Sequence, residues 1–376
     1  MTKAEKLLRE LIALPSVNPA LVTGNPGRAG EQHVADFLAS VAAQAGLDVS
    51  FQKVLPRRSN LLARLSPPGK VRQRILLVPH LDTVDAADES RFVPRLDRDR
   101  LYGRGACDTK GSVAAMLAAL CDIARSRQRP RESEIIFAGV VDEENAQAGS
   151  RALVAGGLEA DLAIVGEPPR LKAVTAHKGS LWLRLQTRGR SAHGSRPELG
   201  RNAVHAMARI VNGLETDYAR RLRSRRHTLL GCATVSVGTI SGGTQPNIVP
   251  DSCAVTIDRR TLPGETETGV RREIAGFLAQ RKLKAAFASE KLAPCPPLET
   301  DAGLPLVRRF LRCTGQPHPA GADFFCDAAV LAQGGIPSVV FGPGDIAQAH
   351  TRDEWISQAE LGAAKEILVR FLRSLP

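Results

Sequence analysis

Five short segments of this chain carry side chains that bind divalent metal ions, and each follows an apolar run, a loop or a glycine-rich turn. They are His80-Leu81-Asp82-Thr83-Val84, Asp108-Thr109-Lys110-Gly111, Asp142-Glu143-Glu144-Asn145, Gly166-Glu167-Pro168 and Gln348-Ala349-His350. Histidines and carboxylates without a thiolate suit zinc, cobalt or manganese in a catalytic site rather than a structural one. An aspartate can bridge two ions about 3.5–4 Å apart, an arrangement that serves hydrolysis. We therefore expect a metal-dependent amide hydrolase with two divalent ions.

The elements that would position these side chains alternate between strand and helix. Apolar runs predict buried strands, and helical stretches lie between them, at 75–78, 112–124, 135–141, 150–155 and 162–165. This β-α-β-α-β order predicts an α/β domain with a mostly parallel sheet and helices on both faces. Ligands collect at the carboxyl ends of such strands. The candidate metal ligands would therefore meet at one edge of the sheet, with Asp108 at the positive end of the helix that follows it.

The neighbours Glu143 and Glu144 would have different roles. In extended backbone, alternate side chains point to opposite faces. One glutamate could then bind metal while the other stays free as a general base for the attacking water.

The pattern changes in the middle of the chain. Segments predicted as strand or helix follow the order β-α-β-β-α-β, at 180–187, 203–214, 233–240, 253–258, 269–280 and 285–287. This order indicates a small α+β domain inserted in the larger one. We expect the insertion at 174–288 and the catalytic domain at 1–173 and 289–376.

Composition limits the classes of protein. The chain has 376 residues, 43% hydrophobic and 24% charged, which suits a globular protein of about two domains. The net charge of +12 raises the question of nucleic acid, but the one dense basic run, 220–227, has no stacking platform beside it. A solvated arginine-rich segment is the better interpretation, and the positive charge would steer an anionic substrate.

Cysteine usage and the N-terminus point to the cytoplasm. The seven cysteines are scattered and show no C-x-x-C spacing, which favours a reducing compartment. Cys107 precedes Asp108 and is either a small buried residue, which we favour, or a soft metal ligand. The N-terminus has the pattern of an amphipathic helix, not of a signal peptide. No apolar run approaches the roughly 20 residues of a membrane span.

Together these motifs resemble those of the M20 family of metallo-aminoacylases and peptidases, over nearly the whole chain. The matching segments are 80–84, 103–111, 142–144, 166–168 and the final His350. The resemblance implies a zinc-hydrolase fold with His80 and Glu167 on one ion, Glu144 and His350 on the other, and Asp108 bridging both. It implies Glu143 as the base and Asp82 as the residue that fixes the imidazole of His80. Zinc is the ion that the resemblance favours, with cobalt or manganese as alternatives.

The inserted domain resembles the family's ferredoxin-like dimerisation domain, which forms a lid. Its loop at 191–197 resembles the loop whose histidine, here His193, reaches the partner subunit's site and stabilises the oxyanion. The segments 242–250 and 258–260 suggest Asn247 and Arg259 as clamps for a substrate carboxylate. The resemblance therefore implies a homodimer.

The resemblance also orders the possible substrates, which are N-acyl amino acids or short peptides. The stretch 341–354 is close to the acetylornithine deacetylase version of the final motif, so hydrolysis of N-acetyl-L-ornithine to ornithine and acetate is the leading prediction. A succinyl-diaminopimelate desuccinylase and a carboxypeptidase or dipeptidase are the alternatives. The segment 321–328 departs from the common pattern, which leaves the acyl and side-chain pockets open.

Other classes of protein fit less well. The segment 103–108 fails the dinucleotide-binding G-x-G-x-x-G pattern at its last position. A nucleic-acid binder would depend on the 220–227 run alone. A non-catalytic relative would have lost Glu143 or a metal ligand, and all of them are present.

Overall fold

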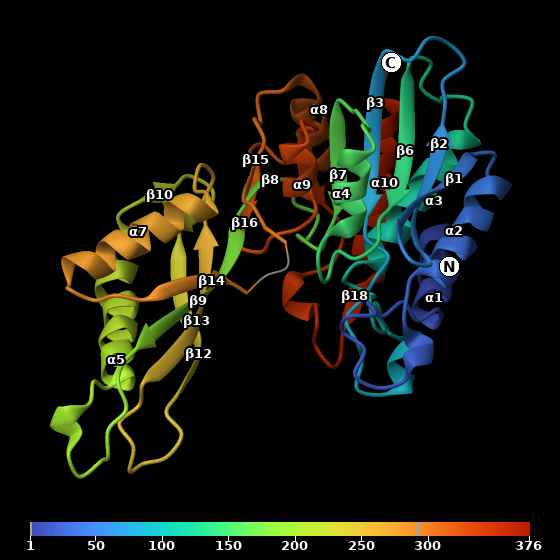
Figure 1. The fold of residues 1–376 in the computed structure, drawn as a ribbon. Helices are drawn as coiled ribbons and strands as arrows, with labels where there is room; N and C mark the ends of the chain where they lie inside the picture. The colour runs from blue at the N-terminus through green and yellow to red at the C-terminus, as the bar shows by residue number, and fades with distance from the viewer. Residues whose placement is uncertain (1, 291–292) are drawn as a thin grey trace. The chain divides into compact units, whose positions relative to one another are not determined.

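The computed structural model describes residues 2–290 and 293–376, and the chain forms two compact units (Figure 1). The first unit comprises residues 1–175, 300–320 and 326–376. The second comprises residues 176–299 and 321–325. The predicted insertion at 174–288 ends earlier than the second unit does, and the short return of the chain at 321–325 has no counterpart in the prediction.

The first unit is built on a mixed sheet with a parallel centre. Its strand order is β1-β2-β6-β3-β7-β17-β8. The strands are β1 (Asp48–Leu55), β2 (Arg58–Leu65), β3 (Gln73–Pro79), β6 (Ser133–Gly139), β7 (Leu162–Gly166), β8 (Val174–His177) and β17 (Ser338–Phe341). Strands β6, β3, β7 and β17 are parallel neighbours, whereas β1, β2 and β8 pair antiparallel. The predicted α/β class with a mostly parallel sheet is confirmed.

The central strands are apolar on both faces because both faces are covered. On β3, Ile75 and Leu77 belong to one core cluster, and the alternate residues Leu76 and Val78 are equally buried on the other face. Near-continuous apolar runs are what a sheet between two helical layers requires. The pair β1–β2 escaped prediction because β1 is largely exposed and polar.

Helices cover the two faces of this sheet (Figure 1). They are α1 (Lys3–Ala13), α2 (Gln32–Gln44), α3 (Lys110–Ala124), α4 (Ala148–Ala155), α8 (Pro305–Thr314), α9 (Ala328–Gln333) and α10 (Gln358–Arg373). Helix α3 is buried along almost its whole length and packs against α1, α10 and the central strands, while α4 packs with α9. A small separate sheet consists of β4 (Arg95–Asp97), β5 (Arg100–Tyr102) and β18 (Trp355–Ser357).

The second unit is an antiparallel sheet of order β12-β13-β9-β14 with two main helices. Its main elements are β9 (Gly179–Arg188), α5 (Ala203–Gly213), α6 (Ala219–Arg223), β12 (Thr234–Gly242), β13 (Ser252–Thr261), α7 (Glu267–Gln280) and β14 (Ala286–Ser289). Shorter strands are β10 (Arg226–His227) and β11 (Gly231–Cys232), which pair with each other. The short strands β15 (Leu298–Glu299) and β16 (Ala320–Ala322) both pair with β8 and extend the sheet that begins with β1. The order β9-α5-β12-β13-α7-β14 is the predicted β-α-β-β-α-β arrangement.

No helix within residues 2–290 and 293–376 combines the length and the hydropathy that a membrane span requires.

Candidate metal centre

The candidate ligands lie where strands of the first unit end. His80 and Asp82 follow β3, and an isolated parallel bridge pairs His80 with Val140 just beyond β6. Glu167 directly follows β7. Asp108 precedes α3 by two residues, where the positive end of the helix dipole favours a carboxylate. The parallel strands thus bring distant segments to one edge of the sheet.

Asp108 presents its two carboxylate oxygens to two different histidines. Its Oδ1 lies 3.1 Å from Nε2 of His80, and its Oδ2 lies 3.3 Å from Nε2 of His350. Glu167 Oε1 is 3.9 Å from the same nitrogen of His80, and Glu144 Oε2 is 3.1 Å from that of His350. The structure therefore brings the five predicted ligands together as two sets that share Asp108.

The spacing of these atoms suits metal ions. Ligand atoms about 2.0–2.1 Å from a tetrahedral zinc ion lie about 3.3 Å from one another. The four separations above, from 3.1 to 3.9 Å, bracket that value. His80, Asp108 and Glu144 also offer ligand atoms that all lie within 4.8 Å of one another.

Charge argues for metal ions more strongly than spacing does. Asp108, Glu144 and Glu167 are carboxylates that face the Nε2 atoms of His80 and His350. Burial raises the pKa of Glu144, and that of Glu167 well above its usual range. Buried carboxylates are costly unless they are paired or coordinate a metal. With Glu143 beside them, four acids meet two imidazoles, and two divalent cations would supply four positive charges.

Without metal ions, protons on the two histidines balance part of this negative charge. Hydrogen bonds with Asp108 and Glu144 raise the pKa of His350 to about 10. Burial acts to lower the pKa of His80, but hydrogen bonds with Asp108 and Asp82 hold it well above its usual value. Burial acts to raise the pKa of Asp108, and the two histidines hold it below its usual value. Metal binding at this site would therefore release protons.

The side chains of Glu143 and Glu144 have different surroundings, but strand alternation, the predicted reason, does not cause this. They lie in a turn after β6, not in extended backbone, so strand alternation does not separate them. Asp142, which precedes the turn, has a φ of 70° in the left-handed region. Glu144 turns toward His350. Burial raises the pKa of Glu143 well above its usual range, and neighbouring acids, Glu167 first, add to the rise.

Asp82 is fully buried and holds more than the histidine. The nearest partner of His80 Nδ1 is the backbone carbonyl of Asp82 at 3.0 Å, with its Oδ1 at 3.5 Å. Its carboxylate accepts the backbone N–H groups of Glu143 and Glu144, both at 3.1 Å. It also accepts the side-chain amide of Asn18 at 2.7 Å. Asp82 therefore positions the two glutamates as well as the imidazole.

Glu354, which the sequence analysis did not single out, holds the loop that carries Asp108. Its carboxylate accepts the backbone N–H groups of Gly105 and Cys107, both at 2.8 Å, and that of Asp108 at 2.9 Å. It also pairs with Arg104 Nη1 at 2.7 Å, and both side chains are buried. In the sequence, Glu354 stands in a charged stretch that is typical of a solvated loop, so its type and position gave no signal.

Asp327 is a second buried acid that the sequence analysis did not single out. It precedes α9, and Ser150 Oγ donates to its Oδ1 at 2.5 Å. Burial raises its pKa to about 6. Its charge is one of those that raise the pKa of Glu143. It lies in the segment 321–328, which departs from the common pattern.

Cys107 is a buried thiol. Its Sγ donates to the backbone carbonyl of Asp345 at 3.3 Å. Burial, with the nearby charges of Glu354 and Asp108, raises the pKa of the thiol. Metals bind the thiolate, so the favoured interpretation as a small buried residue fits this environment.

The candidate residues His193 and Asn247 of the second unit lie on neighbouring exposed loops. A bridge pairs His193 with Ile248, and the backbone N–H of Gly194 donates to the carbonyl of Asn247 at 2.7 Å. His193 Nδ1 is 2.7 Å from the hydroxyl oxygen of Ser195. The two segments that the sequence analysis selected are therefore adjacent in space.

Arg259, predicted as a clamp for a substrate carboxylate, is fully buried in the structure. Its guanidinium pairs with Glu265 at 2.7 Å and donates to the backbone carbonyl of Arg260. These contacts hold the side chain inside the second unit. Arg260 points to the other face of β13, where it is half-buried, pairs with Asp258 at 3.0 Å and lies over the ring of Phe325. It is the more accessible arginine.

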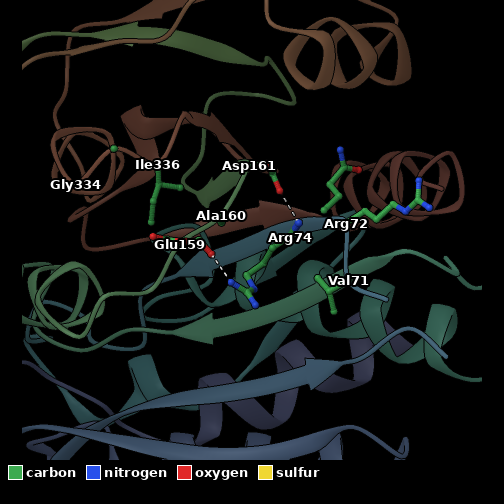
Figure 2. A pocket seen from close by; sticks show the side chains of 10 residues that line it. Val71, Arg72, Arg74, Glu159, Ala160, Asp161, Gly334 and Ile336 are labelled. Atoms are coloured by element: carbon green, nitrogen blue, oxygen red, sulfur yellow. Dashed lines mark hydrogen bonds between the residues drawn. The ribbon is translucent and has the colours of Figure 1, made fainter. Parts of the chain in front are cut away.

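A pocket of about 550 Å³ lies at the opposite, amino-terminal ends of the strands (Figure 2). It is lined by 71–74, 159–161 and 334–336, which precede or begin β3, β7 and β17. Arg74 pairs with Glu134 at 2.5 Å and donates to the carbonyl of Glu159 at 3.0 Å. None of the candidate ligands lines this pocket, so the chemistry belongs to the other edge of the sheet.

Comparisons with known proteins agree with this geometry. The model of peptidase family M20/M25/M40 matches residues 76–374. Acetylornithine deacetylase of Proteus mirabilis (strain HI4320) is 31% identical over 383 residues, covering 98% of this chain and 96% of that protein. The solved aminopeptidase PepT of Bacillus cereus ATCC 10987 has a TM-score of 0.78 at 20% identity, covering 99% of this chain and 97% of that one. The Bacillus subtilis YXEP protein, a dinuclear metal binding M20 peptidase, has a TM-score of 0.71 at 15% identity and covers 98% and 96%.

Replacing Glu354 by alanine should weaken metal binding by about 10- to 100-fold, because the loop that carries Asp108 loses its acceptor. Titration of the metal-free protein in competition with a chelating dye measures this affinity. Glu366→Ala is the matched control, since Glu366 is an exposed glutamate of α10. Unchanged metal affinity in Glu354→Ala would contradict the role assigned to this carboxylate.

Proposed function

Because this chain belongs to peptidase family M20/M25/M40, we propose that it hydrolyses the amide bond of an N-acyl amino acid, with N-acetyl-L-ornithine as the leading substrate. The products are ornithine and acetate. The observation that carries the proposal is the Asp108 carboxylate, which offers one oxygen to His80 and the other to His350. A carboxylate so placed suits a bridge between two divalent ions. We propose zinc, with cobalt or manganese as alternatives.

In this proposal each ion has its own pair of ligands. His80 and Glu167 would hold one ion, Glu144 and His350 would hold the other, and Asp108 would serve both. When bound, two such ions polarise the carbonyl of the scissile amide and lower the pKa of the attacking water.

Glu143 performs the proton transfers. It accepts a proton as water adds to the amide carbon, and it gives that proton to the nitrogen as the C–N bond breaks. Burial raises its pKa, which brings a carboxylate closer to the range in which it both accepts and releases a proton near neutral pH. The hydrogen bond from its backbone N–H to Asp82 keeps the base in place.

Similar proteins and the chain's charge support the choice of substrate. The relative that is 31% identical over nearly the whole length is an acetylornithine deacetylase. The net charge of +12 suits a substrate with a free carboxylate. A desuccinylase, or a carboxypeptidase or dipeptidase, keeps the same chemistry and is the alternative. The aminopeptidase and the YXEP peptidase are under 25% identical and bear on the fold alone.

We also propose that the second unit mediates a homodimer and that the enzyme works in the cytoplasm. Strand β12 is an edge of its sheet, and Ile240 and Ile248 are exposed apolar side chains on it or just beyond it. Such an edge suits a partner. In the dimer, His193 stabilises the oxyanion in the partner subunit's site, and Asn247 binds substrate. The cysteines are scattered and show no C-x-x-C spacing, which supports a reducing compartment.

A substrate panel tests the function. Ninhydrin-detected amine release should be fastest from N-acetyl-L-ornithine, compared with other N-acetyl amino acids, succinyl-diaminopimelate and dipeptides. A chelator should abolish release, and zinc or cobalt should restore it. Cleavage of only the succinyl compound or peptides would keep the mechanism and overturn the substrate.

Glu143→Ala should lower kcat by about 10²- to 10⁴-fold, because proton transfer loses its base. Both metal ions should stay bound, since Glu143 is not among the proposed ligands, and elemental analysis of the variant counts them. Retained turnover in a metal-loaded variant would remove Glu143 from its role.

The two neighbouring arginines should behave differently. Arg260→Met should raise KM by about 10- to 100-fold, because the accessible arginine would no longer bind the substrate carboxylate and a hydrogen bond to a charged group contributes about this much. The unfolding temperature should change little. Arg259→Met should instead lower the free energy of unfolding by about 1–3 kcal/mol, because Glu265 loses its buried partner. Steady-state kinetics and urea unfolding measure the two effects. The opposite pattern would restore Arg259 as the clamp.

His193→Ala should lower kcat by about 10²- to 10³-fold, as loss of an oxyanion donor does. If the residue acts across a dimer, mixing inactive His193→Ala and Glu143→Ala subunits should restore activity, because one site of the mixed dimer is complete. Light scattering confirms that the mixture is dimeric. A fully active monomer, or mixed dimers without activity, would reject action across the dimer.

A further inference from the structure

Two buried carboxylates, those of Glu31 and Asp82, accept hydrogen bonds from the turn that carries the proposed base. The backbone N–H of Asp142 donates to Glu31 Oε1 at 3.2 Å. The next two N–H groups, of Glu143 and Glu144, donate to the carboxylate of Asp82 at 3.1 Å each. Three consecutive N–H groups thus have carboxylate acceptors. Asp82 was expected near the site, but Glu31 was not.

Glu31 is itself held by Arg58 in a two-point contact. Arg58 Nε donates to Glu31 Oε2 at 2.8 Å, and Arg58 Nη2 donates to Glu31 Oε1 at 2.5 Å. The Glu31 side chain is 1% exposed and that of Arg58 is 11% exposed. Arg58 begins β2, and Glu31 directly precedes α2. The pair therefore ties two elements of the scaffold to the turn.

The remaining nitrogen of Arg58 reaches the turn directly. Its Nη1 donates to Asp142 Oδ1 at 3.0 Å. The same oxygen accepts the side-chain amide of Asn18 at 3.1 Å, and that amide also donates to Asp82 at 2.7 Å. Asp142 is therefore held at its backbone by Glu31 and at its side chain by Arg58 and Asn18.

These hydrogen bonds hold Asp142 in a backbone conformation that costs free energy. Asp142 has a φ of 70°, in the left-handed region that non-glycine residues adopt at a cost. This conformation directs the chain into the turn that presents Glu143. A buried ion pair is weak evidence for stability as such, because desolvation offsets the attraction. The Arg58–Glu31 pair matters here because it fixes the backbone geometry of Asp142.

We propose that Arg58 and Glu31 are a positioning pair that holds the Asp142 turn and thereby aims Glu143 at the attacking water. The pair contacts the turn at Asp142, through the backbone N–H and the side chain of that residue, and it acts on Glu143 through the geometry of the turn. The inference rests on the proposed function for its kinetic test, and a structural test stands apart from it.

Kinetics of Arg58→Ala on N-acetyl-L-ornithine supply the first test. With the base misplaced, kcat should fall by about 10- to 100-fold, while KM changes little and both zinc ions stay bound. Added guanidinium should occupy the space of the lost side chain and restore part of kcat. Unchanged kcat, or loss of a metal ion that accounts for the loss of kcat, would overturn the proposal.

Amide hydrogen exchange supplies a test that needs no substrate. In Arg58→Ala the peptide that spans residues 142–144 should exchange faster than in the wild type, and guanidinium should slow it again. Unchanged exchange there would overturn the proposal. If the wild type fails to cleave N-acetyl-L-ornithine, the proposed function fails on that result, and the exchange experiment still decides this inference.

Two further variants separate positioning from general stability. Arg74→Met removes another arginine–glutamate pair, with Glu134, at the opposite end of the strands. This variant should leave kcat and exchange at 142–144 unchanged. The double variant Glu31→Leu with Arg58→Met removes both charges, which avoids a lone buried charge and favours folding. It should still lose kcat. Wild-type kcat in the double variant, or an equal loss in Arg74→Met, would overturn the proposal.

Discussion

Negative charge concentrated at one buried edge of a sheet is the constraint on which the catalytic unit depends. Asp108, Glu144 and Glu167 face His80 and His350 across distances of 3.1 to 3.9 Å, and a further glutamate lies beside them. Carboxylates in such a place cost free energy unless cations balance them. Binding of divalent ions therefore affects the stability of this fold as well as its chemistry. Each bound ion offsets the free-energy cost of the buried carboxylates, which protons on the histidines partly offset in the metal-free protein.

The loops that carry the candidate ligands also need hydrogen-bond acceptors for their backbone N–H groups, and other carboxylates supply them. Backbone N–H groups in loops beyond the strand ends lack the partners that a sheet or helix gives, and buried ones must find acceptors. The carboxylate of Glu354 accepts three such N–H groups in the loop that carries Asp108. Asp82 accepts two in the turn that carries Glu143, and Glu31 accepts one more. The first and last of these acids have their own arginines, Arg104 and Arg58. Acids thus serve the site in two ways, as ligands and as holders of the loops that carry ligands.

The candidate ligands were easier to select from the sequence than the residues that support them, for a physical reason. His80 and Glu167 directly follow strands β3 and β7, so an apolar run that ends in either residue is informative by itself. A support such as Glu354 only has to meet its partner in space, and in sequence it is indistinguishable from a solvated charge. The turn at Glu143 was missed because the residues after a strand were assumed to stay extended. The burial of Arg259 was not predicted either, because a sequence does not state which face of a strand is buried.

The division into two units explains why the reaction class follows from the sequence more readily than the substrate does. In the first unit, the candidate side chains contact one another, and those other than His350 are largely buried, so a change at one position disturbs the rest. In the second, His193 and Asn247 lie on exposed loops and Arg260 on an accessible sheet face, where residues can change without damage to the core. Chemistry is then constrained by burial, while specificity is free to evolve where burial ends.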